Sequence, residues 1–257
     1  MKDLILQVQE VSISFGGLMA LGEVSFDLPR GRITALIGPN GAGKTTAINV
    51  ISGIYRPQKG RVFFKGQSVT GQRPYRLACL GLTRTFQNIQ IFQDMTVLEN
   101  VMVGLHSRTQ KEFLSSLFFL PGVRQEEREI ERKAWEILDF FNLRNKGPWP
   151  AASLSYGDQK RVEMARALAS QPDLILLDEP VAGLNMTETL EVAQLIRRIC
   201  AQGISVLLVE HDMNLVMKIS DQIVVLNFGQ KIAEGPPEAI QKDPQVLAAY
   251  LGTEAGC

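Results

Sequence analysis

The segment GPNGAGKT, residues 38–45, holds the residue types with the clearest chemistry in this chain. It matches the pattern G-x-x-x-x-G-K-[ST] and lies between an apolar run typical of a strand and a stretch typical of a helix. In such a loop the backbone N–H groups turn toward phosphate oxygens, a lysine adds charge at the β- and γ-phosphates, and a hydroxyl can ligate Mg²⁺. A glycine turn before a helix, with no ligand, is the alternative. The expected nucleotide contacts are Gly38, Pro39, Asn40, Gly41, Ala42, Gly43, Lys44, Thr45 and Thr46.

Two adjacent carboxylates end a second apolar run, LILLDEP at residues 174–180. Asp178 is in the position of a strand-end acid that holds Mg²⁺, often through water. Glu179 could orient or deprotonate an attacking water molecule. Carboxylates are common at strand ends, so this interpretation depends on the phosphate-binding pattern elsewhere in the chain.

Three further residues have both a functional and a purely structural interpretation. His211 follows the apolar run ISVLLVE and is a candidate sensor of a γ-phosphate, or else a surface histidine. Gln87 lies where strand-like sequence gives way to helical sequence and is uninformative by itself. Phe15 ends an early strand, where it could stack on an adenine ring or pack into the core.

Hydrophobic periodicity predicts the elements that must position these side chains. Alternating or apolar runs predict strands, and apolar residues at helical spacing predict helices. Strands alternating with helices indicate an α/β fold with a parallel sheet. Between residues 87 and 169 strand signals nearly vanish, which predicts an inserted helical subdomain. The predicted strands or hairpins cover 4–15, 22–31, 32–38, 60–69, 172–180, 204–212 and 221–235, and the predicted helices cover 44–53, 96–105, 128–143, 186–203, 213–220 and 236–252.

Composition excludes several classes of function. Lys+Arg and Asp+Glu both number 27 in 257 residues, so the zero net charge argues against a nucleic-acid binder. The three cysteines are far apart and odd in number, which favours a reduced compartment over disulfides or a zinc site. No apolar run approaches the roughly 20 residues of a membrane helix, and the first residues do not resemble a signal peptide. We therefore expect a cytosolic chain whose membrane role, if any, comes from docking. The apolar segment FLSSLFFLPG, residues 113–122, fits a subdomain core better than a surface for a membrane partner.

These motifs, in this order, resemble the ATP-binding cassette (ABC) family over about residues 4–252. GPNGAGKTT is similar to its Walker A motif and LILLDEP to its Walker B motif with catalytic Glu179. Gln87 corresponds to the Q-loop, AGLN at residues 182–185 to the D-loop and His211 to the H-loop. LSYGDQ at residues 154–159 is similar to the signature motif, more usually LSGGQ.

The resemblance implies a P-loop NTPase with a RecA-like core, an antiparallel β subdomain and an inserted helical subdomain. The implied division is 4–86 and 171–236 for the core and β subdomain, 87–170 for the helical subdomain and 237–252 for a helical tail. It also implies ATP and Mg²⁺ as cofactors, with Glu179 and His211 as catalytic residues. The implied ligands of Mg²⁺ are Thr45, Gln87 and Asp178.

The family's partners follow from the same resemblance. Two cassettes, alike or different, would join head to tail, so that Ser155, Gly157 and Gln159 act on ATP held by the other chain. Two membrane permeases would dock on the pair at the cytoplasmic face, and a periplasmic or extracellular substrate-binding protein would act through them. No nucleic acid is expected.

Within the family the chain looks most like the ATPases of branched-chain, hydrophobic amino-acid importers. FGGLMAL, TRTFQNIQIFQDMTVLENV, SYGDQKRVEMARAL and VEHDMNLVM carry this likeness. ATPases of urea importers and lipopolysaccharide exporters are closely similar, so they stay open as alternatives. A soluble ABC protein of DNA repair or the ribosome would carry coiled coils or tandem cassettes, and a GTPase would need the missing aspartate after NKG. Asn185 replaces the usual D-loop aspartate, which leaves the D-loop's hydrogen bonding to a partner chain in question. Tyr156 and Asp158 replace a glycine and a glutamine of the signature but keep Ser155, Gly157 and Gln159.

Overall fold

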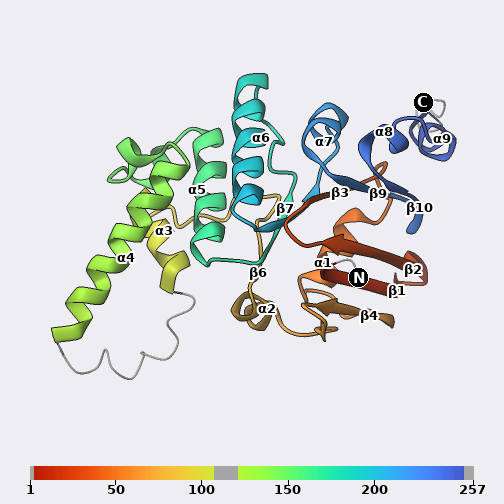
Figure 1. The fold of residues 1–257 in the computed structure, drawn as a ribbon, viewed down its shortest axis with the longest axis horizontal. Coiled ribbons are helices and arrows are strands. Elements are labelled where there is room, and N and C mark those ends of the chain that lie inside the picture. Colours follow the sequence, from red (N-terminus) through yellow and green to blue (C-terminus); the bar gives the residue numbers. More distant parts are fainter. Residues whose placement is uncertain (1–2, 107–120, 252–257) are drawn as a thin grey trace.

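The computed structural model describes residues 3–106 and 121–251. Its largest sheet has the strand order β10-β9-β3-β8-β7-β6 (Figure 1). The neighbours from β9 to β6 all pair in parallel, and β10 adds an antiparallel edge. The strands are β3 (Ile33–Ile37), β6 (Leu82–Arg84), β7 (Leu174–Asp178), β8 (Ser205–Val209), β9 (Gln222–Asn227) and β10 (Gln230–Gly235). The α/β fold with a parallel sheet is therefore confirmed.

The central strands are buried on both faces, which explains why they read as unbroken apolar runs. In β7, Leu174 and Leu176 join one hydrophobic cluster, whereas Ile175 and Leu177 join another. Successive side chains of a strand point to opposite faces, so one strand can contribute to two cores.

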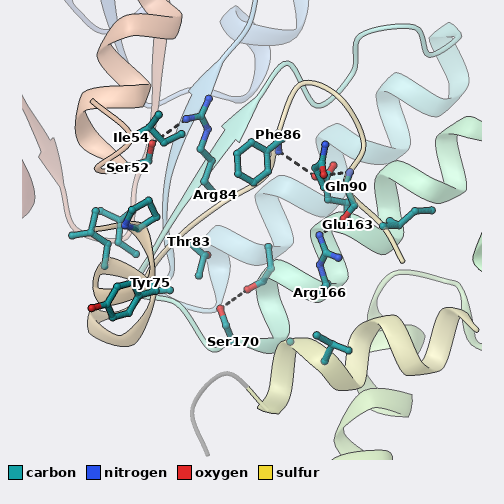
Figure 2. Close-up of a pocket in the computed structure, with 18 of the residues that line it drawn as sticks. Ser52, Ile54, Tyr75, Thr83, Arg84, Phe86, Gln90, Glu163, Arg166 and Ser170 are labelled. Carbon is teal, nitrogen blue, oxygen red and sulfur yellow. Dashed lines mark hydrogen bonds between the residues drawn. The ribbon is translucent and has the colours of Figure 1, made fainter. Parts of the chain in front are cut away.

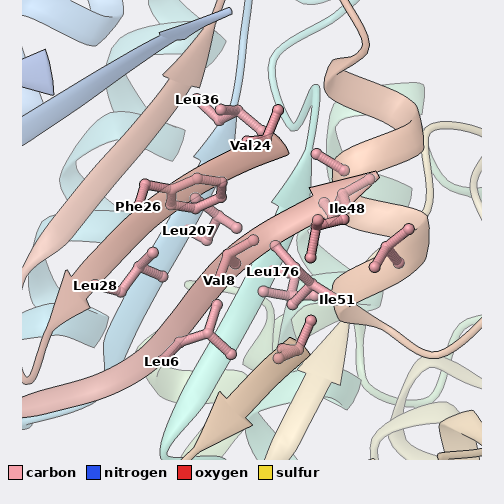
Figure 3. Close-up of a cluster of buried hydrophobic side chains, with 14 of the residues drawn as sticks. Leu6, Val8, Val24, Phe26, Leu28, Leu36, Ile48, Ile51, Leu176 and Leu207 are labelled. Atoms are coloured by element: carbon pink, nitrogen blue, oxygen red, sulfur yellow. The ribbon is translucent and has the colours of Figure 1, made fainter. Parts of the chain in front are cut away.

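A second, antiparallel sheet packs on the first through helix α1 (Lys44–Ile51). Figure 3 shows Phe26 and Val8 of this sheet with Leu207 and Leu176 of the parallel sheet and Ile48 of α1. Each such side chain contributes about 1.5–3 kcal/mol when it leaves water. The strand order is β2-β1-β4-β5, with bounds Leu4–Phe15 for β1, Leu18–Pro29 for β2, Lys59–Phe64 for β4 and Gln67–Ser68 for β5.

Helices α3 (Val97–His106), α4 (Pro121–Phe140) and α5 (Tyr156–Ala169) form the helical part (Figure 1). They share a core of wholly or almost wholly buried apolar side chains, in agreement with the helical spacing predicted for residues 96–105 and 128–143. Short 3₁₀ helices at Arg144–Lys146 and Ala151–Ser153 lead into α5. The division at residues 87 and 170 stays a prediction. Residues 113–120 of the apolar segment predicted as subdomain core lie outside the described residues.

Two elements between β5 and Gln87 were not predicted from the sequence. Helix α2 (Pro74–Leu80) begins with a proline in its first turn and ends at Gly81, whose φ is 98°. Strand β6 has only three residues and pairs with β7. A three-residue strand is too short to show a period, so only its pairing reveals it.

The remaining helices cover one face of the parallel sheet. They are α6 (Met186–Ala201), α7 (Met213–Ile219), α8 (Pro237–Ile240) and α9 (Pro244–Leu251). Within residues 3–106 and 121–251 no helix is both long and apolar enough to cross a membrane. Cys79 and Cys200 are free thiols, and Cys257 lies outside the described residues.

Candidate active site

The loop 38–43 joins β3 to α1 and depends on glycine at two positions where it meets other backbone. Gly38 has a φ of 152°, and a Cβ there would lie 2.1 Å from the carbonyl oxygen of Leu226. Gly43 has a φ of 100°, and a Cβ there would lie 2.7 Å from the carbonyl oxygen of Ala20. Helix α1 begins without a side-chain cap, so its first N–H groups are available to an anion.

Lys44 places a cation inside this loop. Its Nζ donates hydrogen bonds to the carbonyl oxygens of Gly38 at 2.7 Å and Pro39 at 2.9 Å. Burial lowers the pKa of the Lys44 ammonium, and the nearby carboxylates of Glu179 and Asp178 oppose that shift. The loop is therefore folded around a positive charge, as a phosphate site requires.

Asp178, the predicted metal ligand at the end of β7, is buried and paired. Its Oδ2 accepts a hydrogen bond from the Arg84 guanidinium at 2.7 Å. Arg84 also donates to Asn49 Oδ1 at 2.6 Å and to Ser52 Oγ at 3.0 Å, so it ties β6 to α1. Arg84 could not be predicted from the sequence, because the three-residue strand β6 that carries it shows no period of its own.

Gln87, Glu179 and His211 converge from three separate segments. Gln87 Nε2 donates to Glu179 Oε2 at 3.0 Å, and His211 Nδ1 lies 4.0 Å from Glu179 Oε1. Glu179 has a φ of 49°, a conformation that costs a non-glycine residue about 1–3 kcal/mol and is common at functional sites. The parallel strands β7 and β8 end side by side, which is why residues so far apart in sequence meet here.

The oxygen-rich donor set fits Mg²⁺. Thr45, Gln87 and Asp178 offer a hydroxyl, an amide oxygen and a carboxylate, which are the ligand types that this ion takes. In the part of the chain that the structure describes, no group of three His, Cys, Asp or Glu side chains could hold a metal. A Mg²⁺ ion at this position would therefore need phosphate oxygens and water to complete its shell.

The signature residues form a capped helix start apart from the phosphate loop. Ser155 is the N-cap of α5, and its Oγ accepts a hydrogen bond from the N–H of Asp158 at 3.3 Å. Gln159 Nε2 donates to the carbonyl of Leu154 at 3.2 Å. A Cβ on Gly157 would lie 2.8 Å from Glu188 Oε1. The side-chain hydrogen bonds of Ser155 are thus with Asp158, and Gly157 lies against Glu188; in the described residues neither is bonded to residues 38–46.

The departures from the usual motifs have local structural roles. Asp158 is buried and pairs with Lys146 and with Arg161, the latter at 2.8 Å. Asn185 is the N-cap of α6, in a capping box with Glu188. Asparagine and aspartate are equally good N-caps, so this substitution leaves the helix start intact.

Phe15 does not pack into the core. Its side chain is 46% exposed and meets only the edge of Tyr55 among the ring contacts of the described residues, with centroids 5.2 Å apart. The core-packing interpretation of Phe15 is therefore wrong. The open ring is free to stack on a flat ligand.

The segment around Gln87, residues 86–90, is clamped by two α5 residues that the sequence did not mark as functional. Glu163 Oε1 accepts hydrogen bonds from the N–H of Phe86 at 3.1 Å and of Gln90 at 3.4 Å, and Arg166 donates to the carbonyl of Gln90 (Figure 2). Burial raises the pKa of the Glu163 carboxyl; these two hydrogen bonds and the charges of Arg166 and Lys160 oppose the rise. Glu163 and Arg166 are two of five charged residues in α5, so their sequence positions alone gave no signal that separates them from the others.

These side chains line a cavity of about 580 Å³ between α2, β6, residues 86–92, α3 and α5 (Figure 2). Tyr75, Phe86 and Phe92 surround it and are 54%, 42% and 45% exposed. Large aromatic side chains that stay open to solvent around a hollow are typical of an interaction site.

Comparison with protein families identifies two matching regions. Residues 21–182 match the family described as "ABC transporter". Residues 230–256 match the family described as "Branched-chain amino acid ATP-binding cassette transporter". Together the matches include both the phosphate loop and the closing strand and helices.

Relatives and solved structures agree with these matches over nearly the whole chain. The chain is 42% identical over 249 residues to the high-affinity branched-chain amino acid transport ATP-binding protein BraF of Pseudomonas aeruginosa, covering 96% of this chain and 98% of BraF. It is 41% identical over 253 residues to LivG of Escherichia coli K12, a protein with the same description, covering 98% and 99%. The crystal structure of the ADP conformation of MJ1267, an ATP-binding cassette of an ABC transporter, superposes with a TM-score of 0.84 at 37% identity, covering 97% and 99%. The chain therefore belongs to the ABC transporter family, as an ATP-binding and ATP-hydrolysing cassette.

Proposed function

We propose that this chain energises the import of branched-chain, hydrophobic amino acids through partner membrane permeases. The main evidence for the ATPase site is the convergence of Gln87, Glu179 and His211 at one end of the parallel sheet. The described functions of BraF and LivG and the family match at residues 230–256 support branched-chain amino acids as the substrate.

Residues 38–46 bind the triphosphate of ATP in this proposal. The uncapped start of α1 and the buried Lys44 ammonium supply the positive potential that phosphates need. The exposed ring of Phe15 supplies a face for adenine. Thr45, Gln87 and Asp178 would hold Mg²⁺, which would neutralise phosphate charge when bound.

Hydrolysis of ATP needs a positioned water molecule and stabilised charge rather than covalent help. Glu179 orients the water, and the hydrogen bond from Gln87 Nε2 fixes one of its carboxylate oxygens. His211 braces the γ-phosphate from its position 4.0 Å from the same carboxylate. Gln87 thereby links the reacting water to the segment that lines the cavity of Figure 2.

Two cassettes join head to tail, and each signature helix completes the other chain's site. Ser155, Gly157 and Gln159 then contact ATP held by the partner chain. The separation of their contacts from residues 38–46 supports this arrangement. A dimeric cassette bound to ADP and Pi, MJ0796, has the same fold at 26% identity and a TM-score of 0.75.

The aromatic-rimmed cavity receives a permease. Its walls come from the segment after Gln87 and from α2, α3 and α5, so a docked permease touches the segment that holds Glu179 through Gln87. This docking places the chain at the cytoplasmic face of the membrane. A substrate-binding protein outside the membrane delivers the amino acid to the permeases.

A transport assay tests the proposal. The chain is reconstituted in proteoliposomes with the permeases and the binding protein encoded beside it, and ATP-dependent uptake of labelled leucine is measured. We expect uptake in the wild-type complex and none with Glu179→Gln. Uptake of urea but not leucine, or ATP hydrolysis that does not respond to the permeases, would contradict the substrate or the transport role respectively.

A further inference from the structure

Lys160 is a buried cation whose proton points at the main chain of the proposed catalytic residue. It lies on α5, is 3% exposed, and its Nζ donates a hydrogen bond to the carbonyl oxygen of Glu179 at 2.9 Å. Burial lowers the pKa of the Lys160 ammonium, and the carboxylates of Glu163, Glu210, Glu179 and Asp178 oppose the shift. Lysine is almost never fully buried without a partner, so this contact needs an explanation.

The peptide that Lys160 holds is the strained one. Glu179 has a φ of 49°, and its N–H donates to the carbonyl of Val209 at 2.8 Å. Its carbonyl accepts from Lys160 on one side and from the N–H of Ala182 at 3.2 Å on the other. The backbone that aims the Glu179 side chain is therefore fixed by β8 from one direction and by α5 from the other.

The same helix turn also packs on the loop that follows Glu179. A Cβ on Gly183 would lie 3.2 Å from the Tyr156 ring, and Lys160 Nζ lies 5.7 Å from the centre of that ring. Gly157 approaches Glu188 at the start of α6. A shift of the first turn of α5 is thus transmitted to residues 179–188 through close contacts.

We propose that Lys160 is a positioning residue that couples the two ATP sites of a dimer. The first turn of α5 carries the signature residues that meet the partner's nucleotide, and Lys160 ties that turn to Glu179 in the chain's own site. Binding of the signature residues to one nucleotide thereby orients the Glu179 carboxylate that acts on the other nucleotide. The inference rests on the proposed roles of Glu179 and the signature residues.

The test removes the hydrogen-bond donor at position 160 and then restores a donor there. In the complete transporter complex, Lys160→Met is expected to lower the kcat of ATP hydrolysis about tenfold and to reduce the Hill coefficient toward one, with KM little changed, as expected for lost transition-state stabilisation. Lys160→Arg keeps a donor at this point and is expected to recover most of the rate. Lys242→Met, in an exposed turn before α9, is the matched control.

A second measurement separates positioning from general damage. ATP-driven dimerisation is followed by gel filtration in Glu179→Gln and in the double variant with Lys160→Met, and both are expected to dimerise equally. If Lys160→Met does not fold, Lys160→Gln takes its place. Wild-type kcat and Hill coefficient in the Lys160 variant, or a folded Lys160→Arg protein as slow as Lys160→Met, would overturn the inference. Full turnover by Glu179→Gln would instead overturn the proposed function.

Discussion

The end of the parallel sheet and the first turn of α5 are both rich in glycine and polar side chains, but they are built in opposite ways. Helix α1 starts at Lys44 with no side-chain cap, whereas Ser155 caps α5 with its own hydroxyl. The backbone N–H groups at an uncapped helix N-terminus are available to a ligand. In a capped helix one of these N–H groups already donates a hydrogen bond to the capping side chain. The first region is therefore built as a receptor for phosphate. The second has one of its helix-start donors satisfied within the chain, and in the proposed dimer it closes on a nucleotide held by the other chain.

The largest effect is expected from removing the carboxylate of Glu179 at the end of the parallel sheet. Glu179→Gln keeps the size of the side chain but removes the base, so ATP hydrolysis should fall by about 10²–10⁴-fold. ATP binding should persist and accumulate a dimer, measured by gel filtration with ATP. Glu238→Gln, an exposed residue of α8, is the control and should hydrolyse ATP normally. Normal turnover by Glu179→Gln would remove Glu179 from the proposed mechanism.

Mixing two inactive variants sharpens the comparison of the two regions. Lys44→Met disables the phosphate loop and Ser155→Arg blocks the signature. In a head-to-tail dimer of one of each, one site has both defects and the other has none, so an equal mixture should recover ATP hydrolysis up to about a quarter of wild-type activity, and coupling through Lys160 would lower that value. ATP hydrolysis by the mixture is compared with each variant alone. No recovery, in a mixture shown to form mixed dimers, would mean that the signature acts within its own chain.

The neighbouring carboxylates Asp178 and Glu179 have different surroundings. Asp178 is paired with Arg84, whereas Glu179 faces Gln87 and His211, and a substitution of Arg84 tests this difference. Asp178 is paired with Arg84 at 2.7 Å with both side chains almost fully buried. Arg84→Met leaves that charge uncompensated and should lower the free energy of unfolding by about 3–5 kcal/mol. Arg30→Met breaks the exposed pair with Asp3 and should cost less than about 1 kcal/mol. Urea denaturation of both variants decides whether the Asp178 pair is structural.

The smallest effect is a pH dependence at the clamp on residues 86–90. The pKa of Glu163 is raised in the folded protein, so the native state holds this proton more tightly than the unfolded chain does. Relative to Glu163→Gln, the wild type should be most stable below about pH 4.3, the ordinary glutamate pKa, and should lose that advantage as pH rises through the raised pKa. Denaturation of both proteins from pH 4 to 7 measures the difference. Glu210, whose pKa is also raised by burial, is present in both and cancels. A difference that grows with pH would contradict this origin.

The parts of the fold that were predictable are those whose pattern is local. Apolar runs such as LILLD and helical spacing in α6 and α4 reflect burial on two faces or one. The helix α2 and strand β6 were not predictable because one is short and capped by turns and the other gains its identity only by pairing with β7. Arg84 was lost with them.

For the site, the sequence by itself determined the residue types and their order: the glycine-rich loop with Lys44, the carboxylates 178–179, Gln87, His211 and the signature. These follow from motif spacing, since backbone contact with phosphate demands glycine and charge at fixed positions. Only the tertiary structure decided that Gln87 holds Glu179, that Glu163 clamps the segment after Gln87, and that Lys160 holds the strained peptide of Glu179. The physical reason is distance along the chain. These contacts join residues up to 92 positions apart, and no local periodicity encodes which buried charge will meet which backbone group once the strands and α5 have packed.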